Sequence, residues 1–231
     1  MLPAFHTKRT LQKRAENILP AFDPAMRLVM MIVFLWCSQL SVAQMVEVYG
    51  GNKRAGVDIL WFKYFRKADS TRTPWLFFSR NRASVNYSNQ SLWGSTNAVS
   101  YNFKNGLGIV AVGAFGSNGF VPKAGVQYFK QKGDFLFFGW LVADLQSNGN
   151  VDLFGLFRYQ PPLNARWRLL AQAELFPIYH PGSKLWNLTQ RFRLGLKYHS
   201  WGGGLMLDLN QTGSENFTTT HNVGGFIRHD F

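Results

Sequence analysis

The segment Arg191-Phe-Arg-Leu-Gly-Leu-Lys-Tyr-His199 alternates between two kinds of side chain. Its even-numbered positions are apolar or aromatic, namely Phe192, Leu194, Leu196 and Tyr198. Its odd-numbered positions are basic residues or glycine, namely Arg191, Arg193, Gly195, Lys197 and His199. Successive side chains of a β-strand point to opposite faces, so this period of two predicts a strand with one apolar and one basic face.

The same alternation continues in both directions, interrupted by short segments rich in Gly, Asn and Pro. These residue types suit the backbone angles of tight turns, and they therefore mark strand ends. The pattern predicts an all-β chain with strands at 45–50, 55–67, 74–87, 95–104, 107–116, 120–131, 134–146, 150–160, 165–177, 185–199, 203–211 and 218–231. Twelve is an even number, as expected when both termini of an antiparallel transmembrane barrel lie on one side. The first strand is short, and ten strands is the alternative if it does not span the barrel.

The strands of a soluble β-sandwich also alternate apolar and polar residues. The placement of aromatic residues distinguishes a membrane barrel from such a sandwich. They make up 16% of the chain, and many flank the short turns assigned to one end, such as Tyr101, Phe103, Tyr198 and Trp201. Rings at one level around a sheet are typical of the interfacial girdle of a membrane protein. The sequence therefore predicts a transmembrane, antiparallel, up-and-down β-barrel in contact with a lipid bilayer.

The N-terminal segment has the features of a secretory signal peptide. Arg27 precedes an apolar run at 28–36, and Ser41-Val42-Ala43 supplies small residues for cleavage after Ala43. This predicts a basic leader and signal peptide over 1–43, with Met26 as an alternative start, and an exported barrel over 44–231. An uncleaved anchor is the competing interpretation. The one cysteine, Cys37, lies in the predicted leader, which leaves none in the barrel for disulfides or metal ligation.

The last strand, Asn222-Val-Gly-Gly-Phe-Ile-Arg-His-Asp-Phe231, ends in an aromatic residue. Together with the signal peptide and the alternating strands, it makes the chain resemble bacterial outer-membrane β-barrels. The resemblance implies an outer-membrane location and recognition of Val223, Ile227 and Phe231 by the barrel-assembly machinery. His229 departs from the pattern, because a hydrophobic residue is common at that position. Twelve-stranded barrels of this kind include porins for acidic oligosaccharides, nucleoside channels and a phospholipase.

The charged residues predicted to face the lumen suggest what the barrel could do. The formal net charge is +13, and alternation places a set of basic side chains in the lumen: Lys63, Arg80, Arg82, Arg158, Arg166, Arg168, Arg191, Arg193 and Lys197. A basic lumen favours passage of small anionic solutes, so one hypothesis is a small monomeric channel similar to porins. The inward acids are fewer, namely Asp144, Asp152, Glu174 and Asp208, and Asp144, Glu174 and Asp208 are the possible ion-pair partners of the basic residues. The alternative is a closed structural or ligand-binding barrel with internal ion pairs.

The sequence gives little support to catalysis. The outer-membrane phospholipase uses a His and a Ser two positions apart, whereas His199 and Ser200 are adjacent and point to opposite faces. A lipid hydrolase is therefore the weakest of the three hypotheses, and we expect no catalytic residues. No His/Asp/Glu spacing predicts a metal site, and nothing predicts a cofactor. Export and the aromatic girdle argue against nucleic acid as the partner of the basic residues.

Overall fold

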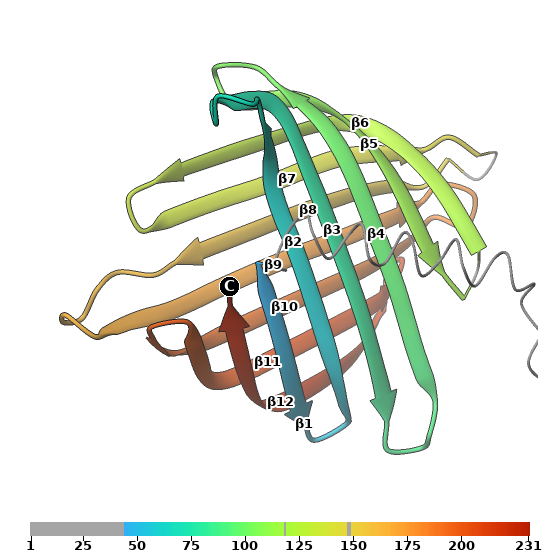
Figure 1. The fold of residues 1–231 in the computed structure, drawn as a ribbon. Helices are drawn as coiled ribbons and strands as arrows, with labels where there is room; N and C mark the ends of the chain where they lie inside the picture. The colour runs from blue at the N-terminus through green and yellow to red at the C-terminus, as the bar shows by residue number, and fades with distance from the viewer. Residues whose placement is uncertain (1–43, 118, 147–148) are drawn as a thin grey trace, which may run out of the picture. The chain divides into compact units, whose positions relative to one another are not determined.

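The computed structural model describes residues 44–117, 119–146 and 149–231. The predicted signal peptide, with its cleavage after Ala43 and the alternative start at Met26, lies outside these residues. The described part forms twelve antiparallel strands (Figure 1): β1 Met45–Gly51, β2 Arg54–Arg66, β3 Arg72–Asn86, β4 Ser91–Asn102, β5 Leu107–Gly116, β6 Gly119–Lys132, β7 Phe135–Asp144, β8 Val151–Tyr159, β9 Trp167–His180, β10 Leu185–Tyr198, β11 Trp201–Gly213 and β12 Phe217–Asp230. Each strand pairs with its neighbours in sequence, and the sheet closes into a barrel. The predicted up-and-down barrel of twelve strands is confirmed.

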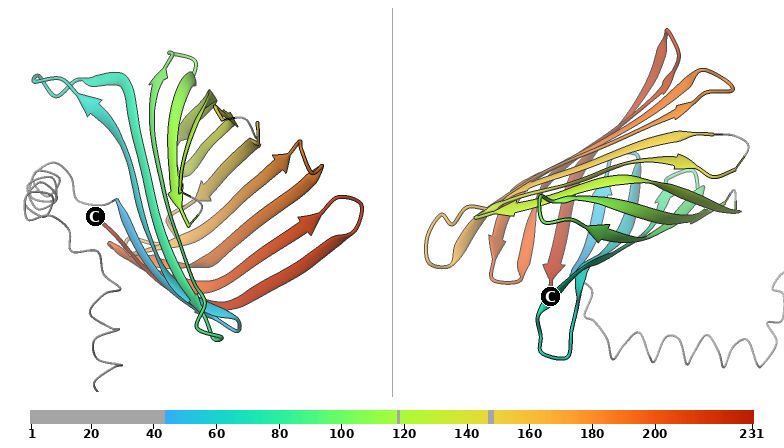
Figure 2. Two further views of the ribbon diagram at one scale, coloured as in Figure 1. Left: turned by 90° about the vertical axis from the view of Figure 1, so that its right-hand side faces the viewer. Right: turned by 90° about the horizontal axis from the view of Figure 1, so that it is seen from above.

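Closure of the barrel depends on the short first strand. On one side β1 pairs with β12, from Met45 opposite Asp230 to Gly51 opposite Gly224. On its other side β1 pairs with β2, from Met45 opposite Leu60 to Gly50 opposite Ala55. The C-terminal end of β12 therefore lies next to the start of β1 (Figure 2). The alternative of ten strands is excluded, because without β1 the edges of β2 and β12 would have no partner.

β1 starts and β12 ends at the same end of the barrel, which we call the end with the termini. The connections between strands at this end are mostly tight. In the β4–β5 connection Gly106 has φ of +92°, a conformation that glycine adopts without steric cost. A Cβ placed there would lie 2.6 Å from the Phe129 carbonyl oxygen. Glycine at 106 therefore serves two purposes, because the turn needs both the left-handed backbone and the close approach of β6.

Inward-facing side chains fill the wall formed by β2 to β8 with an aromatic cluster. Phe138 is 0% exposed and Phe78 is 2% exposed, and their rings stack with centroids 5.3 Å apart. Trp140 and Phe154 contact the same cluster, with centroids 5.0 Å from each other. Aromatic burial of this extent is a large source of stability, so the core of this barrel lies within its lumen.

The outward positions carry apolar side chains that stay exposed in the isolated chain. Leu194 is 58% exposed, Leu205 is 72% exposed and Ile227 is 62% exposed. At the end with the termini the outward rings contact one another in pairs, for example Trp75 with Tyr101 at 5.3 Å and Trp167 with Tyr198 at 5.0 Å between centroids. A closed antiparallel barrel with an apolar exterior and an aromatic girdle is built to span a membrane.

Within the described part of the chain, no helix is long and apolar enough to cross a membrane.

Candidate functional site: an arginine-rich lumen

Four buried carboxylates, each on a different strand, face the lumen. They are Glu47 on β1, Asp58 on β2, Glu174 on β9 and Asp208 on β11, and none is more than 4% exposed. Successive side chains of a strand point to opposite faces, and the residues next to each of these carboxylates face the lipid, so the carboxylates point inward. Burial of a carboxylate is costly unless it is paired and hydrogen-bonded, so the arrangement of basic partners around them decides whether the lumen is stable.

Arg80 joins two of these carboxylates across the barrel. Its Nη2 lies 2.5 Å from Asp58 Oδ2, and its Nη1 lies 2.8 Å from Glu174 Oε2. Arg82 binds the same aspartate, with 2.6 Å between Nη2 and Oδ2. Arg191 also lies 3.4 Å from Glu174, so three arginines share two carboxylates and positive charge is in excess at this point.

Glu47 is the centre of a second group of ion pairs. Arg193 donates from Nε to Glu47 Oε1 at 2.9 Å, and Arg228 donates from Nη2 to Oε2 at 2.5 Å. Arg193 also reaches Asp208 Oδ1 with Nη1 at 2.7 Å. All of these side chains are at most 3% exposed, so the pairs are held in a region that water does not reach.

Gln172 on β9 connects the two groups. Its Oε1 accepts from Arg158 Nε at 2.9 Å and from Arg228 Nη1 at 2.9 Å. Its Nε2 donates to Glu174 at 2.7 Å. The result is a continuous hydrogen-bonded network from β1 and β12 to β3, and such networks are rigid when every member is satisfied.

The network contains more positive than negative charge. Seven arginines (Arg54, Arg80, Arg82, Arg158, Arg191, Arg193 and Arg228) face four carboxylates. Two of the arginines are bound loosely, because Arg54 and Arg191 each lie 3.4 Å from the nearest carboxylate oxygen. The Nε atoms of both are buried with no hydrogen-bond partner among the described residues. An anion in the lumen would find these two donors available.

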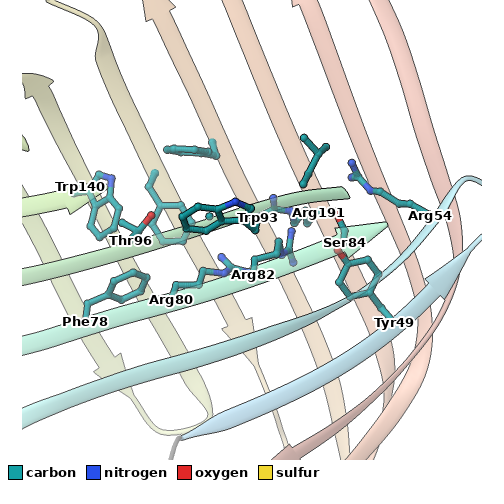
Figure 3. A pocket seen from close by; sticks show the side chains of 14 residues that line it. Tyr49, Arg54, Phe78, Arg80, Arg82, Ser84, Trp93, Thr96, Trp140 and Arg191 are labelled. Atoms are coloured by element: carbon teal, nitrogen blue, oxygen red, sulfur yellow. The ribbon is translucent and has the colours of Figure 1, made fainter. Parts of the chain in front are cut away.

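A cavity of about 270 Å³ opens above the network, at the end of the barrel opposite the termini. Phe78 and Trp140 lie at one end of it and Tyr49 and Arg54 at the other, with Arg80 and Arg82 between them (Figure 3). The cavity thus combines guanidinium groups with aromatic surface. A site of this composition suits a small anion that carries an apolar part.

Three smaller ion-pair groups lie outside this network. Lys123 on β6 binds Asp144 and Asp152, both at 2.7 Å. Lys197 pairs with Asp230 near the end with the termini, and Arg168 bonds to Asp134 and to the Gln160 carbonyl oxygen. The basic and acidic side chains of these groups are therefore paired with each other.

The structure corrects the predicted lumen set at two positions. Lys63 lies on the outer face, because it is opposite Phe77 in the pairing of β2 with β3 and shares its parity with Ile59 and Trp61. Arg166 lies before β9, in the turn, and is exposed. The alternation misplaced Arg166 because it does not continue through a turn. It misplaced Lys63 because this basic residue occupies an outward position near the end of β2.

The remaining predicted basic residues lie on the inward face: Arg80, Arg82, Arg158, Arg168, Arg191, Arg193 and Lys197. Of the predicted acids, Glu174 and Asp208 pair with arginines, whereas Asp144 pairs with Lys123. The sequence prediction missed Glu47, Asp58, Arg54 and Arg228, although the alternation in β1, β2 and β12 places all four inward. Glu47 lies between the outward residues Val46 and Val48 in sequence.

The lumen offers no evident metal centre. Among the residues that the structure describes, no group of three or more His, Cys, Asp or Glu side chains is placed to bind one ion. His221 and Thr219 share the outer face of β12, away from the carboxylates of the lumen.

Comparison with family profiles finds no match, and comparison with curated proteins finds no significant match. Among solved structures, the β-domain of the Bordetella autotransporter BrkA is similar, with 10% sequence identity and a TM-score of 0.32. The similarity covers 81% of this chain and 96% of that one. A TM-score this low has no bearing on function, and the barrel is established by its own strand pairing.

Proposed function

We propose that this protein is a closed bacterial outer-membrane barrel that binds a small, partly apolar anion in the arginine-lined cavity. The observation that carries the proposal is the excess of arginines over carboxylates around a cavity that Phe78 and Trp140 also line. The buried Nε donors of Arg54 and Arg191, which have no hydrogen-bond partner within the described part of the chain, add to it. An anion that accepts these bonds would satisfy donors that are otherwise costly to bury.

The binding experiment uses three probes on the refolded barrel in detergent micelles. Phenyl phosphate has both charge and ring, inorganic phosphate has only the charge, and phenol has only the ring. Trp93 and Trp140 line the cavity, so intrinsic fluorescence reports binding. We expect phenyl phosphate to bind at least tenfold more tightly than either of the other two.

Variants separate the cavity from general basicity. Arg191→Gln removes a cavity charge and should weaken phenyl phosphate binding about tenfold, the size expected for loss of one charge-assisted hydrogen bond. Arg166→Gln removes an equal charge in an exposed turn and should leave binding unchanged. Equal binding of phenol and phenyl phosphate, or equal effects of the two variants, would contradict the proposal.

A channel for anions is the second candidate, and the net positive lumen favours it. The filled aromatic cluster and the ion-pair network argue for a closed barrel, since Phe138 and Asp208 are 0% exposed. In planar bilayers we expect no conductance above background. Anion-selective conductance would establish the channel and contradict the closed barrel.

The location and assembly of the barrel have their own test. Val223 and Ile227 lie on the outer face of β12, Phe231 directly follows this strand, and all three are exposed, which supports a role in recognition by the assembly machinery. We expect Phe231→Ala to lower the amount of heat-modifiable protein in outer-membrane fractions severalfold. Phe217→Ala, at the other end of β12, should have little effect. A protein that fractionates as freely soluble would contradict the outer-membrane location.

A further inference from the structure

A cluster of polar side chains interrupts the apolar outer face on β3 and β4. Ser79 Oγ donates to Asn97 Oδ1 at 2.8 Å, and Asn97 Nδ2 donates to Ser95 Oγ at 3.0 Å. Asn81 Nδ2 donates to Ser79 Oγ at 3.3 Å. These four residues, the outer polar cluster, have the parity of Phe77 and Val99, opposite to that of the inward Phe78 and Ala98.

The outer polar cluster lies within the depth of the apolar band. Asn97 is four residues beyond Tyr101 of the girdle, and Ser95 is six residues beyond it. With a rise of about 3.3 Å per residue and a tilt of about 40°, these residues lie roughly 10 to 15 Å above the girdle, and the apolar band is about 25 Å tall. Amide groups at that depth face hydrocarbon, where an unsatisfied polar group is costly.

Neighbouring positions on the same face extend the feature. Trp61 on β2 is directly opposite Ser79, and its indole Nε1 is buried with no hydrogen-bond partner among the described residues. On the other side Ala111 and Ala124, opposite each other on β5 and β6, carry only methyl groups. Small side chains allow another protein surface to approach the sheet closely.

The far wall of the barrel differs at the same depth. Leu194 is four residues from Tyr198, and like Leu205 it is largely exposed. Large aliphatic residues there match lipid chains. The outer face over β3 to β6 also carries large apolar residues, such as Val99, Phe115 and Val126, so the departure from the general pattern is confined to the outer polar cluster and the small residues beside it. The departure indicates contact with protein instead of lipid.

We propose that two copies of this barrel associate within the membrane through the outer face of β3–β6, with Asn81 and Asn97 of each copy hydrogen-bonded across a twofold axis. A second copy fits because each asparagine amide is both a donor and an acceptor, so the same patch is complementary to itself, as a twofold interface requires. Asn97 uses one of its two N–H donors within its own chain, and Asn81 likewise donates once. The remaining amide groups supply the intermolecular bonds.

The oligomeric mass tests the proposal. Light scattering on the full chain in mild detergent should give a dimer, and the double variant Asn81→Leu with Asn97→Leu should give a monomer. Heat-modifiable migration of the variant shows that it is folded. Gln190→Leu is the matched control, because Gln190 is an outward amide on β10, bonded to Gln211 at 2.9 Å; this variant should stay dimeric.

Cysteine cross-linking in native membranes locates the interface. Cys37 is the single cysteine, so Cys37→Ser gives a background into which Ala111→Cys or Leu196→Cys is introduced. Ala111 lies in the proposed interface, and Leu196 lies two residues from Tyr198 on the far wall, at a similar depth. With a short bis-maleimide we expect a product of twice the monomer mass from Ala111→Cys alone. A monomeric wild type that also fails to cross-link, a dimeric double variant, equal cross-linking at both sites, or a product of another mass would overturn the proposal.

Discussion

Arg193 on β10 and Glu47 on β1 are joined by a hydrogen bond of 2.9 Å between Nε and Oε1, although 146 residues separate them along the chain. Both side chains are only 2% exposed. The contact forms only when the barrel closes, because β1 must come to rest between β12 and β2. Ion pairs of this kind link the first strand to strands that are far from it in the sequence.

Removing the charge of Glu47 should destabilise the barrel strongly. Glu47→Gln leaves Arg193 and Arg228 buried beside a neutral group, and loss of one partner of a buried pair costs about 3–5 kcal/mol. Urea unfolding in lipid vesicles measures the change. Glu215→Gln, in an exposed turn between β11 and β12, is the control and should change the free energy of unfolding very little. Equal effects of the two variants would show that the Glu47 pairs add nothing to stability.

The aromatic cluster in the lumen should behave as a protein core. Phe138 is 0% exposed, and Phe138→Ala should cost about 3–5 kcal/mol, because the cavity adds to the lost transfer energy. Phe137 is the adjacent residue on the outer face, where lipid refills the space, so Phe137→Ala should cost clearly less. The same unfolding measurement compares the two. A larger loss at 137 would mean that the lumen is hydrated.

A charge on the outer face should report membrane depth. Leu194→Arg places a guanidinium near the middle of the apolar band and should cost about 2–4 kcal/mol, whereas Tyr198→Arg at the girdle should cost about 0–1 kcal/mol. Folding titrations in vesicles give both values. If the order of the two costs were reversed, the assignment of the girdle would be wrong.

The β2–β3 connection contains a carboxyl group that should titrate below its ordinary range. Thr71 lowers the pKa of Asp69 through its hydroxyl, which donates at 2.6 Å, and through its backbone N–H, at 2.9 Å. The folded pKa is lower than the unfolded one, so these bonds stabilise the turn above the unfolded pKa and are lost as the pH falls through the folded pKa. Thr71→Val should raise the pKa of Asp69 in an NMR titration of its carboxyl carbon.

Thr73→Val is the control for that titration. Thr73 donates its hydroxyl to the Phe65 carbonyl oxygen at 2.9 Å and not to Asp69. Its replacement should leave the titration of Asp69 unchanged. Equal shifts in both variants would point to a general change of the turn, and not to the Thr71 hydrogen bond.

Much of the fold was predictable because the side chains of each strand differ between the face toward lipid and the face toward the lumen. The alternation of Phe192, Leu194 and Leu196 with Arg191 and Arg193 assigns one face to lipid and the other to the lumen. This local rule predicted twelve strands with ends close to the observed ones. It failed at Arg166, where a turn ends the alternation, and at Lys63 on the outer face.

The candidate site was predictable only as a composition. Alternation identified inward arginines, yet it could not show that Arg80 would meet both Asp58 and Glu174. Those residues lie on β3, β2 and β9, and their meeting depends on how the strands are staggered around the closed barrel. Sequence patterns within one strand contain no information on that stagger.

The sequence by itself thus determined the strand number, the antiparallel order and the kind of side chain on each face, because these follow from a period of two and from turn residues. Only the tertiary structure decided that the basic lumen is largely paired, that its excess charge gathers beside aromatic rings in one cavity, and that Ser79, Asn81 and Asn97 form a polar cluster on the outer face. The physical reason is that each of these features joins residues on different strands. Their distances are set by barrel closure and register, which no single strand encodes.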